Sequence, residues 1–331
     1  MAVYTRLDKK GICSLLSRYH LGELVTFQGI AGGVENTNYF LDIATPLHTQ
    51  RYVLTIFEYL PESSLPFFID YTDELNSAGL PVPAAIRDKQ EKAVQRIKGK
   101  PAVIVPCLPG EHLKKLNGNH CQQVGELLGK IHQAGLQSRL KQSNIRGIDW
   151  LDTQQKRLSN LLPKEEVHYM QGQWQGIKNE LPSTSELPKG LIHGDLFHDN
   201  ALFTGDKLTG VIDFYQSCHD YLLYDLAVTV NDWCINSDLE LDHLKTSALL
   251  KAYGSIRPFT PTEQDAWPLM LRLAAFRFWI SRIITFVHPE QAMDSAHQQM
   301  LERCFLDPEK FKAMLELRNI RDTSLPCFLS D

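Results

Sequence analysis

Short β-favouring runs dominate the first third of the chain, and longer amphipathic stretches dominate the rest. Before residue 110, runs rich in β-branched and aromatic residues are typical of strands. They lie at 23–29, 38–43, 51–58, 83–86, 93–97 and 102–105. One helix is predicted among them at 63–78, because Gly79 and then Pro81 would end it. The pattern indicates a small N-terminal lobe built on a sheet.

After residue 110, apolar residues recur at helical spacing. Helices are expected at 119–133, 220–233, 239–253 and 266–285. Among them, residues 190–214 contain two short apolar strands joined by a polar loop and a turn. We therefore predict an α+β chain. We expect an N-terminal lobe at 1–105, a hinge with Pro and Gly at 106–110, and a larger, mainly helical lobe at 111–331.

Composition excludes several classes of protein. The net charge of −5 argues against a nucleic-acid binder, which would carry a basic excess. No apolar run reaches the roughly 20 residues that cross a bilayer, and the N-terminus does not resemble a signal peptide. The seven cysteines are scattered without a Cys-x-x-Cys pair, which fits reduced thiols better than disulfides or a zinc site. We therefore expect a cytoplasmic protein, whose oligomeric state the sequence leaves open.

The polar loop carries the residues that phosphoryl transfer needs. His193-x-Asp195, with Asn200 five residues later, has the spacing of the kinase catalytic loop. In that loop the Asp accepts the proton of the attacking hydroxyl and the Asn binds magnesium. Asp213 follows an apolar strand, in the place of the second metal-binding Asp. We predict that Asp195 is the catalytic base and that Asn200 and Asp213 hold Mg²⁺, which prefers oxygen ligands.

An ordinary hairpin is the alternative, because Asp and Asn are common in turns. The second strand ending in Asp-Phe is an independent requirement of the kinase pattern, and the sequence meets it. The catalytic interpretation is therefore the better one. His193 is expected to orient the loop, whereas His198, Asp199 and His219 are expected to be solvated residues without a catalytic role.

Three motifs together resemble the aminoglycoside phosphotransferase and choline kinase superfamily. They are His193-Gly-Asp-Leu-x-x-x-Asn200, Val211-Ile-Asp-Phe214 and Tyr224-Asp-Leu-Ala227. Three further strings, at 32–40, 53–58 and 106–110, resemble the homoserine kinases of that superfamily. The resemblance implies a two-lobed protein-kinase-like fold with an antiparallel N-terminal sheet. It also implies magnesium-dependent transfer of the ATP γ-phosphate to L-homoserine, giving O-phospho-L-homoserine for threonine biosynthesis.

The nucleotide is expected to bind the N-terminal lobe. Residues 29–38 form a Gly-containing turn between two predicted strands, and glycines let backbone N–H groups approach phosphate. An ordinary hairpin turn is the alternative, but the catalytic loop favours a phosphate-covering role. The predicted contacts are Gly32, Gly33, Val34, Asn36, Thr37 and Asn38. The resemblance adds Pro106, Cys107 and Leu108 beside the adenine edge.

The Lys that the kinase pattern places on the third strand is absent. Its position falls at Thr55, which we keep as a nucleotide contact, and Arg51 lies too far along the strand to replace it. The homoserine kinases resemble this sequence in lacking the Lys. Asp70 and Glu74 on the following helix then have no Lys to pair with, and we expect both to be solvated.

A zwitterionic acceptor needs a cation near its carboxylate and its hydroxyl within reach of the base. Residues 269–282 are apolar nearly all round, so Arg272 and Arg277 should be partly buried and need partners. One partner could be the acceptor carboxylate. The alternative is a set of internal ion pairs to acidic residues, namely Asp220, Asp225 and Asp232. Tyr215 and Asp220 are further candidates for lining the acceptor pocket.

Two other functions stay open. The first is the same reaction on choline, a methylthio-sugar or an aminoglycoside, although a polycationic acceptor would need an acidic cleft. The second is a pseudokinase-like binding module, for which Thr55 in place of Lys is the only support.

Overall fold

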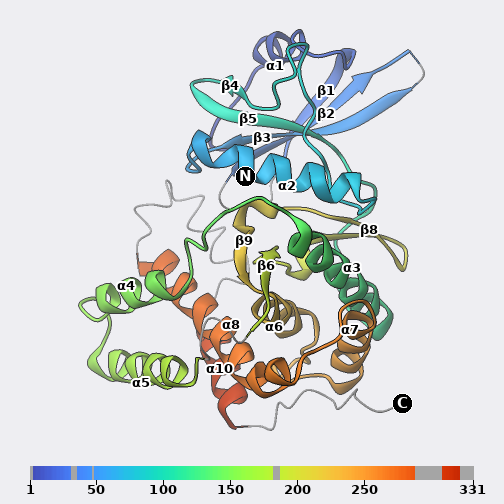
Figure 1. Cartoon of the computed structure of the whole chain (residues 1–331). Helices are drawn as coiled ribbons and strands as arrows, with labels where there is room; N and C mark the ends of the chain where they lie inside the picture. Colours follow the sequence, from blue (N-terminus) through green and yellow to red (C-terminus); the bar gives the residue numbers. More distant parts are fainter. Residues whose placement is uncertain (1–2, 31–35, 47, 182–186, 288–307, 321–331) are drawn as a thin grey trace. The chain divides into compact units, whose positions relative to one another are not determined.

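The computed structural model describes residues 3–30, 36–46, 48–181, 187–287 and 308–320 (Figure 1). They divide into two compact units. The sheet unit contains the described residues up to Pro109 together with Gly210–Ile212. The helical unit contains the described residues of Gly110–Thr209 and those from Asp213 onward. The role of residues 106–110 as a hinge stays a prediction.

Five antiparallel strands form the sheet unit, in the order β1-β2-β3-β5-β4. They are β1 Glu23–Gly29, β2 Asn36–Ala44, β3 Thr49–Phe57, β4 Gln95–Ile97 and β5 Lys100–Pro106. The helices of this unit are α1 Lys9–Leu16, η1 Glu62–Ser64 and α2 Leu65–Ser77. The core includes Ile12 of α1, Leu41 of β2 and Leu54 of β3, all fully buried. The predicted antiparallel sheet is therefore confirmed.

Side chains alternate between the two faces of the sheet. Along β2, Thr37, Tyr39, Leu41 and Ile43 are buried, and the residues between them are less so. Tyr39, Leu41 and Ile43 belong to the core that includes α1. The side chains of Asn36 and Asn38 therefore lie on the opposite face from that core.

One predicted strand, at 83–86, is wrong. The segment is irregular, and Ile86 donates a single backbone hydrogen bond to the carbonyl of Ile104 in β5. Pro83 has no N–H to donate to a strand ladder, and Pro81 lacks one just before it. Pairing with β5 is instead continued by β4.

Helices make up most of the other unit. They are α3 Gly118–Gln137, α4 Ile148–Leu158, α5 Lys164–Glu180, α6 Leu222–Trp233, α7 His243–Ile256, α8 Pro261–Val287 and α10 Pro308–Ile320. Two small antiparallel sheets accompany them. One pairs β6 Lys189–Ile192 with β9 Cys218–Tyr221, and the other contains β7 Ala201–Thr204 and β8 Lys207–Val211. Short turns η2 His198–Asn200 and η3 Phe214–Gln216 follow β6 and β8.

Helices α3 and α7 lie side by side in Figure 1, and glycines let them approach closely. A Cβ added to Gly125 would lie 2.2 Å from the carbonyl oxygen of Leu249, and one added to Gly129 would lie 2.9 Å from Ile256. Gly135, further along α3, is equally close to the backbone of Leu191 in β6. These contacts fix α3 against both α7 and the strand that leads into the polar loop. None of the described helices is long and apolar enough to cross a membrane.

Candidate active site

The loop after β6 folds back on Asp195. The Asp195 carbonyl accepts hydrogen bonds from the Asn200 side-chain amide and the Phe197 backbone, both at 2.8 Å. The Asp195 backbone N–H donates to Nδ1 of His193 at 3.3 Å. His193 is fully buried and thus orients the loop, as the sequence indicated. The Asn200 amide group faces Asp195 through its nitrogen, which leaves its oxygen available as a ligand.

Asp225 of α6 holds the start of the loop. Its two carboxylate oxygens accept the backbone N–H groups of His193 at 2.8 Å and Gly194 at 2.7 Å. Gly194 has φ +79°, and a Cβ there would lie 2.8 Å from the Gln216 carbonyl, so the turn requires glycine. Burial acts to raise the pKa of Asp225, but hydrogen bonds from His132 and the loop backbone outweigh it and lower the pKa. Asp225 is therefore an ionised anchor.

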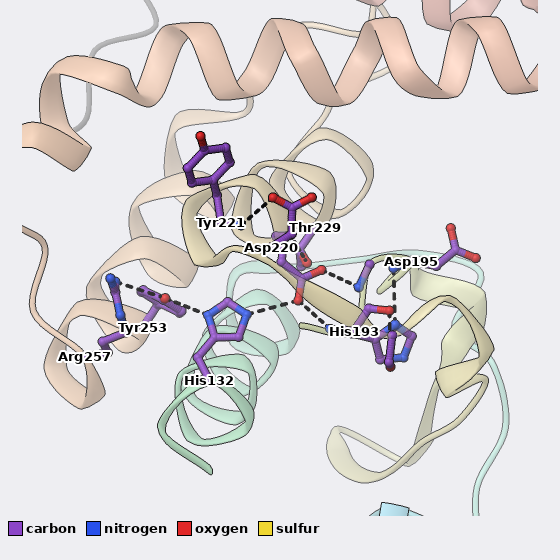
Figure 2. Close-up of polar contacts among 11 residues, drawn as sticks. His132, His193, Asp195, Asp220, Tyr221, Thr229, Tyr253 and Arg257 are labelled. Carbon is purple, nitrogen blue, oxygen red and sulfur yellow. Dashed lines mark hydrogen bonds and ion pairs between the residues drawn. The ribbon is translucent and has the colours of Figure 1, made fainter. Parts of the chain in front are cut away.

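A buried run of hydrogen bonds continues from Asp225 to α3 and α7, and Figure 2 shows its members His132, Tyr253 and Arg257. His132 Nε2 lies 3.0 Å from the Asp225 carboxylate, and its Nδ1 lies 2.7 Å from the Tyr253 hydroxyl. Arg257 donates to that hydroxyl at 3.2 Å and to Glu263 at 2.6 Å. A proton on Nε2 of His132 lets every group in the run donate toward Asp225. The loop is thus supported through three helices.

Two more residues of α6 bind the same loop. The Asp232 carboxylate accepts a hydrogen bond from the backbone N–H of His198 at 2.7 Å and lies 2.8 Å from Nδ1 of the His198 ring. The Trp233 indole donates to the Leu196 carbonyl at 3.1 Å. The hydrogen bond to Asp232 raises the pKa of His198. The prediction that His198 is merely solvated is therefore wrong. The seven-residue spacing of Asp225 and Asp232 along one helix is the sequence signal that could have indicated two contacts to the loop.

Asp195 itself is half-buried and lies among charged groups. Burial raises the pKa of Asp195 to about 7, and the nearby Asp213 adds to that rise. Arg277, Arg282 and Arg146 act in the opposite direction. A carboxylate with a pKa near neutrality suits a general base, because it can both take and release a proton at physiological pH.

Asp213 adopts a left-handed backbone conformation with φ +66° at the start of η3. Such a conformation is uncommon outside glycine and occurs often at functional sites. Within the described residues, no group of three or more His, Cys, Asp or Glu side chains could hold a metal. The set of one amide oxygen from Asn200 and one carboxylate from Asp213 nevertheless fits Mg²⁺, which takes few protein oxygens beside phosphates and water.

The predicted acceptor arginines differ in their surroundings. Arg272 pairs with Glu180 at the end of α5. Arg277 is 4% exposed and acts electrostatically on Asp195. Arg282, one and a half turns further along α8, also acts on Asp195. It lies in the same apolar helix pattern and could have been included on the argument used for Arg277.

The alternative of ion pairs from Arg272 and Arg277 to Asp220, Asp225 or Asp232 is not seen among the described residues, although Arg272 pairs with another acidic residue, Glu180. Asp220 accepts from the Asn144 amide at 2.6 Å, Asp225 holds the loop and Asp232 binds His198. Asp220 thus has a partner outside the arginines. Tyr215 lies in η3, two residues after Asp213.

In the sheet unit, the side chains predicted to contact the nucleotide lie on two different faces of the sheet. Thr55 donates to the Asn38 side chain at 2.8 Å, on the face opposite the core. Thr37 is fully buried, and its hydroxyl donates to Glu58 at 2.6 Å. The structure therefore gives the Thr37 side chain a role inside the sheet unit and not at a nucleotide. Gly32, Gly33 and Val34 lie outside the described residues, and Asn36 begins β2.

The hinge residues continue from β5. Pro106 pairs with Tyr52 of β3, and Cys107 donates its backbone N–H to the Arg51 carbonyl at 3.1 Å. Leu108 packs so closely on Gly210 that a Cβ there would lie 2.6 Å away. Asp70 and Glu74 are exposed, as predicted.

No cation takes the place of the absent third-strand Lys among the described residues. Arg51 forms a bidentate ion pair with Asp42, at 2.7 and 3.0 Å. Lys100 pairs with Glu58, and the Thr37 hydroxyl donates to the same Glu58 side chain. Thr37 lies on the face of the sheet opposite Thr55. The Lys100–Glu58 pair therefore stabilises the sheet from its other side, and no local sequence pattern indicated it.

A family model described as the phosphotransferase enzyme family matches residues 26–259. The chain belongs to this family. A homoserine kinase of Pseudomonas aeruginosa is 41% identical over 326 residues, which cover 98% of this chain and 99% of that protein. A homoserine kinase of Methylobacillus flagellatus is 40% identical over 316 residues, covering 96% and 95%.

Solved structures of other kinases share the fold. Amicoumacin kinase in complex with AMP-PNP and Ca²⁺ superposes with a TM-score of 0.69 at 17% identity, covering 94% of each chain. Choline kinase from Cryptosporidium parvum gives 0.62 at 15% identity, covering 92% of this chain and 99% of that one. The predicted family resemblance, kinase-like fold and phosphotransferase class are thereby confirmed.

Proposed function

We propose that this phosphotransferase is a homoserine kinase, which transfers the γ-phosphate of ATP to the hydroxyl of L-homoserine. The observation that carries the proposal is 41% identity to a homoserine kinase over almost the whole of both chains. Asp195, Asn200 and Asp213 supply the catalytic parts that such a reaction needs. The product, O-phospho-L-homoserine, would serve threonine biosynthesis.

Asp195 accepts the proton of the acceptor hydroxyl. The acceptor oxygen forms a bond to the γ-phosphorus while the bond from that phosphorus to the β-γ bridging oxygen breaks, and ADP leaves. The pKa of Asp195 near 7 keeps much of the carboxylate ionised at neutral pH. Hydrogen bonds to the loop backbone hold the carboxylate in place, which matters because this chemistry depends mainly on positioning.

Asn200 and Asp213 would hold Mg²⁺ through the amide oxygen and the carboxylate. When bound, the ion neutralises charge on the β- and γ-phosphates. The electrostatic repulsion between Asp195 and Asp213 supports this assignment, because a cation beside Asp213 relieves it and lowers the pKa of Asp195.

ATP would bind the sheet unit. The proposed contacts come from three parts of the chain. These are the face of the sheet opposite its core, the predicted Gly-containing turn, and the segment after β5. They are Gly32, Gly33, Val34, Asn36, Asn38, Thr55, Pro106, Cys107 and Leu108. The AMP-PNP in the amicoumacin kinase structure belongs to a protein of the same fold and supports nucleotide use. Without a third-strand Lys, backbone N–H groups would carry more of the phosphate binding.

A cytoplasmic location is part of the proposal. The five described cysteines, Cys13, Cys107, Cys121, Cys218 and Cys234, are free thiols. Free thiols persist in a reducing compartment.

A coupled ADP-release assay with Mg-ATP tests the function. L-Homoserine should support turnover that EDTA abolishes, whereas choline, methylthioribose and kanamycin should not. Turnover on one of those acceptors with homoserine idle would overturn the proposed substrate. Nucleotide binding without turnover on any acceptor would instead favour a binding module.

A further inference from the structure

We infer that Arg277 and Arg282 of α8 bind the carboxylate of the acceptor and select for acceptors that carry one. This inference rests on the proposed function. It starts from two guanidinium groups that form no salt bridge within the described part of the chain, although both act on Asp195 at longer range. The Nε atoms of both are buried without a hydrogen-bond partner there. Arg277 is 4% exposed, so water does not replace a partner.

A buried cation without an anion is strongly unfavourable, because it loses hydration and gains no pairing energy. Aromatic rings meet part of this need. The Arg277 guanidinium lies 4.0 Å from the centre of the Phe278 ring, and Arg282 lies 5.6 Å from that of Phe311. A ring face attracts a cation but cannot accept the planar, two-pronged hydrogen bonds that a guanidinium offers. The Nε–H group of each arginine therefore has no acceptor among the described residues.

Arg277 and Arg282 lie near the catalytic loop, because Phe278, the residue after Arg277, packs on Phe197 of that loop with ring centres 4.7 Å apart. Arg277 is the strongest of the cations that oppose the raised pKa of Asp195, and Arg282 and Arg146 follow. Arg277 also acts on Tyr224 of α6, and Arg282 acts on Asp199 of the loop. Three arginines thus act on one carboxylate. A bound anion would give an acceptor to the Nε atoms of Arg277 and Arg282, which have none among the described residues.

The chemistry of the ligand follows from this arrangement. A hydroxyl must reach Asp195 while an anionic group on the same small molecule reaches the arginines. A carboxylate matches a guanidinium through two parallel hydrogen bonds. The arrangement therefore fits a short hydroxylated amino acid. It disfavours choline and aminoglycosides, whose cationic groups would meet three arginines.

Arg272 provides a matched control on the same helix. It lies five residues before Arg277, and Glu180 already satisfies its guanidinium. A substitution there removes one positive charge from α8 without removing a guanidinium that lacks a partner.

The test compares kcat/KM for L-homoserine and for 3-amino-1-propanol, which keeps the hydroxyl and the amine but lacks the carboxylate. Arg277→Gln and Arg282→Gln should each lower kcat/KM for L-homoserine by about 100-fold, mainly through KM. The value for 3-amino-1-propanol should stay within a few-fold, so the preference for homoserine collapses. Arg272→Gln should leave the preference unchanged.

A second arm does not depend on turnover. Calorimetry would measure the Kd of L-2-aminobutyrate, which has the carboxylate but no reactive hydroxyl, with AMP-PNP present. The Kd should rise about 100-fold in Arg277→Gln and not in Arg272→Gln. If Arg277→Gln does not fold, Arg277→Lys keeps a cation and should show a smaller change in the same direction.

Two results would overturn the inference. One is an equal loss on both acceptors, and the other is a loss of homoserine preference in Arg272→Gln as large as in Arg277→Gln. Failure of the proposed function looks different, because the wild-type protein would then not phosphorylate L-homoserine at all.

Discussion

Asp195 carries a carboxylate whose ionised form is disfavoured by its own surroundings. Burial is the largest cause of its raised pKa, and Asp213 contributes in the same direction. The folded-state pKa of about 7 lies above the usual value of 3.8, so ionising Asp195 costs stability in the native state but not in the unfolded chain. This penalty is absent at low pH, grows above pH 4 and is complete above about pH 7.

Asp195→Asn should therefore lower the activity of the protein and raise its stability. Loss of the proposed base should lower kcat by about 1,000-fold while AMP-PNP binding is kept. In metal-free and nucleotide-free buffer, the variant should melt at a higher temperature than the wild-type protein at pH 8, and the gain should shrink toward pH 5. Differential scanning fluorimetry across this pH range measures it. Asp265→Asn, at an exposed site, should show no such trend. A gain that grows toward pH 5 would contradict the assigned pKa.

Single residues also show where sequence reasoning ends. Asp195, Asn200 and Asp213 could be proposed as site residues because their local spacing matches that of the kinase catalytic loop. The His132 contact to Asp225 spans 93 positions, and the Arg272 contact to Glu180 spans 92. An apolar helix predicts that a buried arginine needs a partner, but only the packed structure shows which arginine has one.

At the level of elements, α6 serves as the support of the catalytic loop. Asp225, Asp232 and Trp233 bind three parts of the loop from one helix. Most strands and helices could be predicted because their apolar periodicity is local. The segment at 83–86 could not, because its apolar residues suit a strand while its prolines cannot complete a ladder.

Close packing of α3 on α7 brings His132 next to Tyr253, and glycine makes it possible. Gly125→Ala should destabilise the protein by about 1–3 kcal/mol, because the new methyl group would collide with the Leu249 carbonyl. Gly172→Ala on α5 is the matched control. Nothing lies within 4 Å of its Cβ position, so it should be neutral or gain up to about 1 kcal/mol. Urea titration measures both, and a stable Gly125→Ala protein would refute the close contact.

For the whole molecule, the two units have their own cores and different optical reporters. All five tryptophans belong to the helical unit, at Trp150, Trp174, Trp233, Trp267 and Trp279. Tryptophan fluorescence therefore follows that unit alone, whereas far-ultraviolet circular dichroism follows both.

Leu54→Ala tests whether the units unfold separately. Leu54 is fully buried in the sheet core, and its truncation should cost about 2–5 kcal/mol. The circular dichroism transition should begin at lower denaturant while the fluorescence midpoint stays unchanged. Thr49→Ala, at an exposed position of the same strand, should alter neither. A common shift of both signals would mean that the chain unfolds as one cooperative structure.

Support of the loop by α6 and the proposed recognition of the acceptor by α8 involve different helices, and this has an evolutionary consequence. The hydrogen bonds that hold the catalytic loop come from α6, whereas the arginines proposed to choose the acceptor lie on α8. Changes at the arginine positions leave the α6 hydrogen bonds to the loop in place. After gene duplication, one copy could therefore acquire a new acceptor through a few substitutions on a single helix. Directed evolution toward other hydroxylated metabolites should begin there.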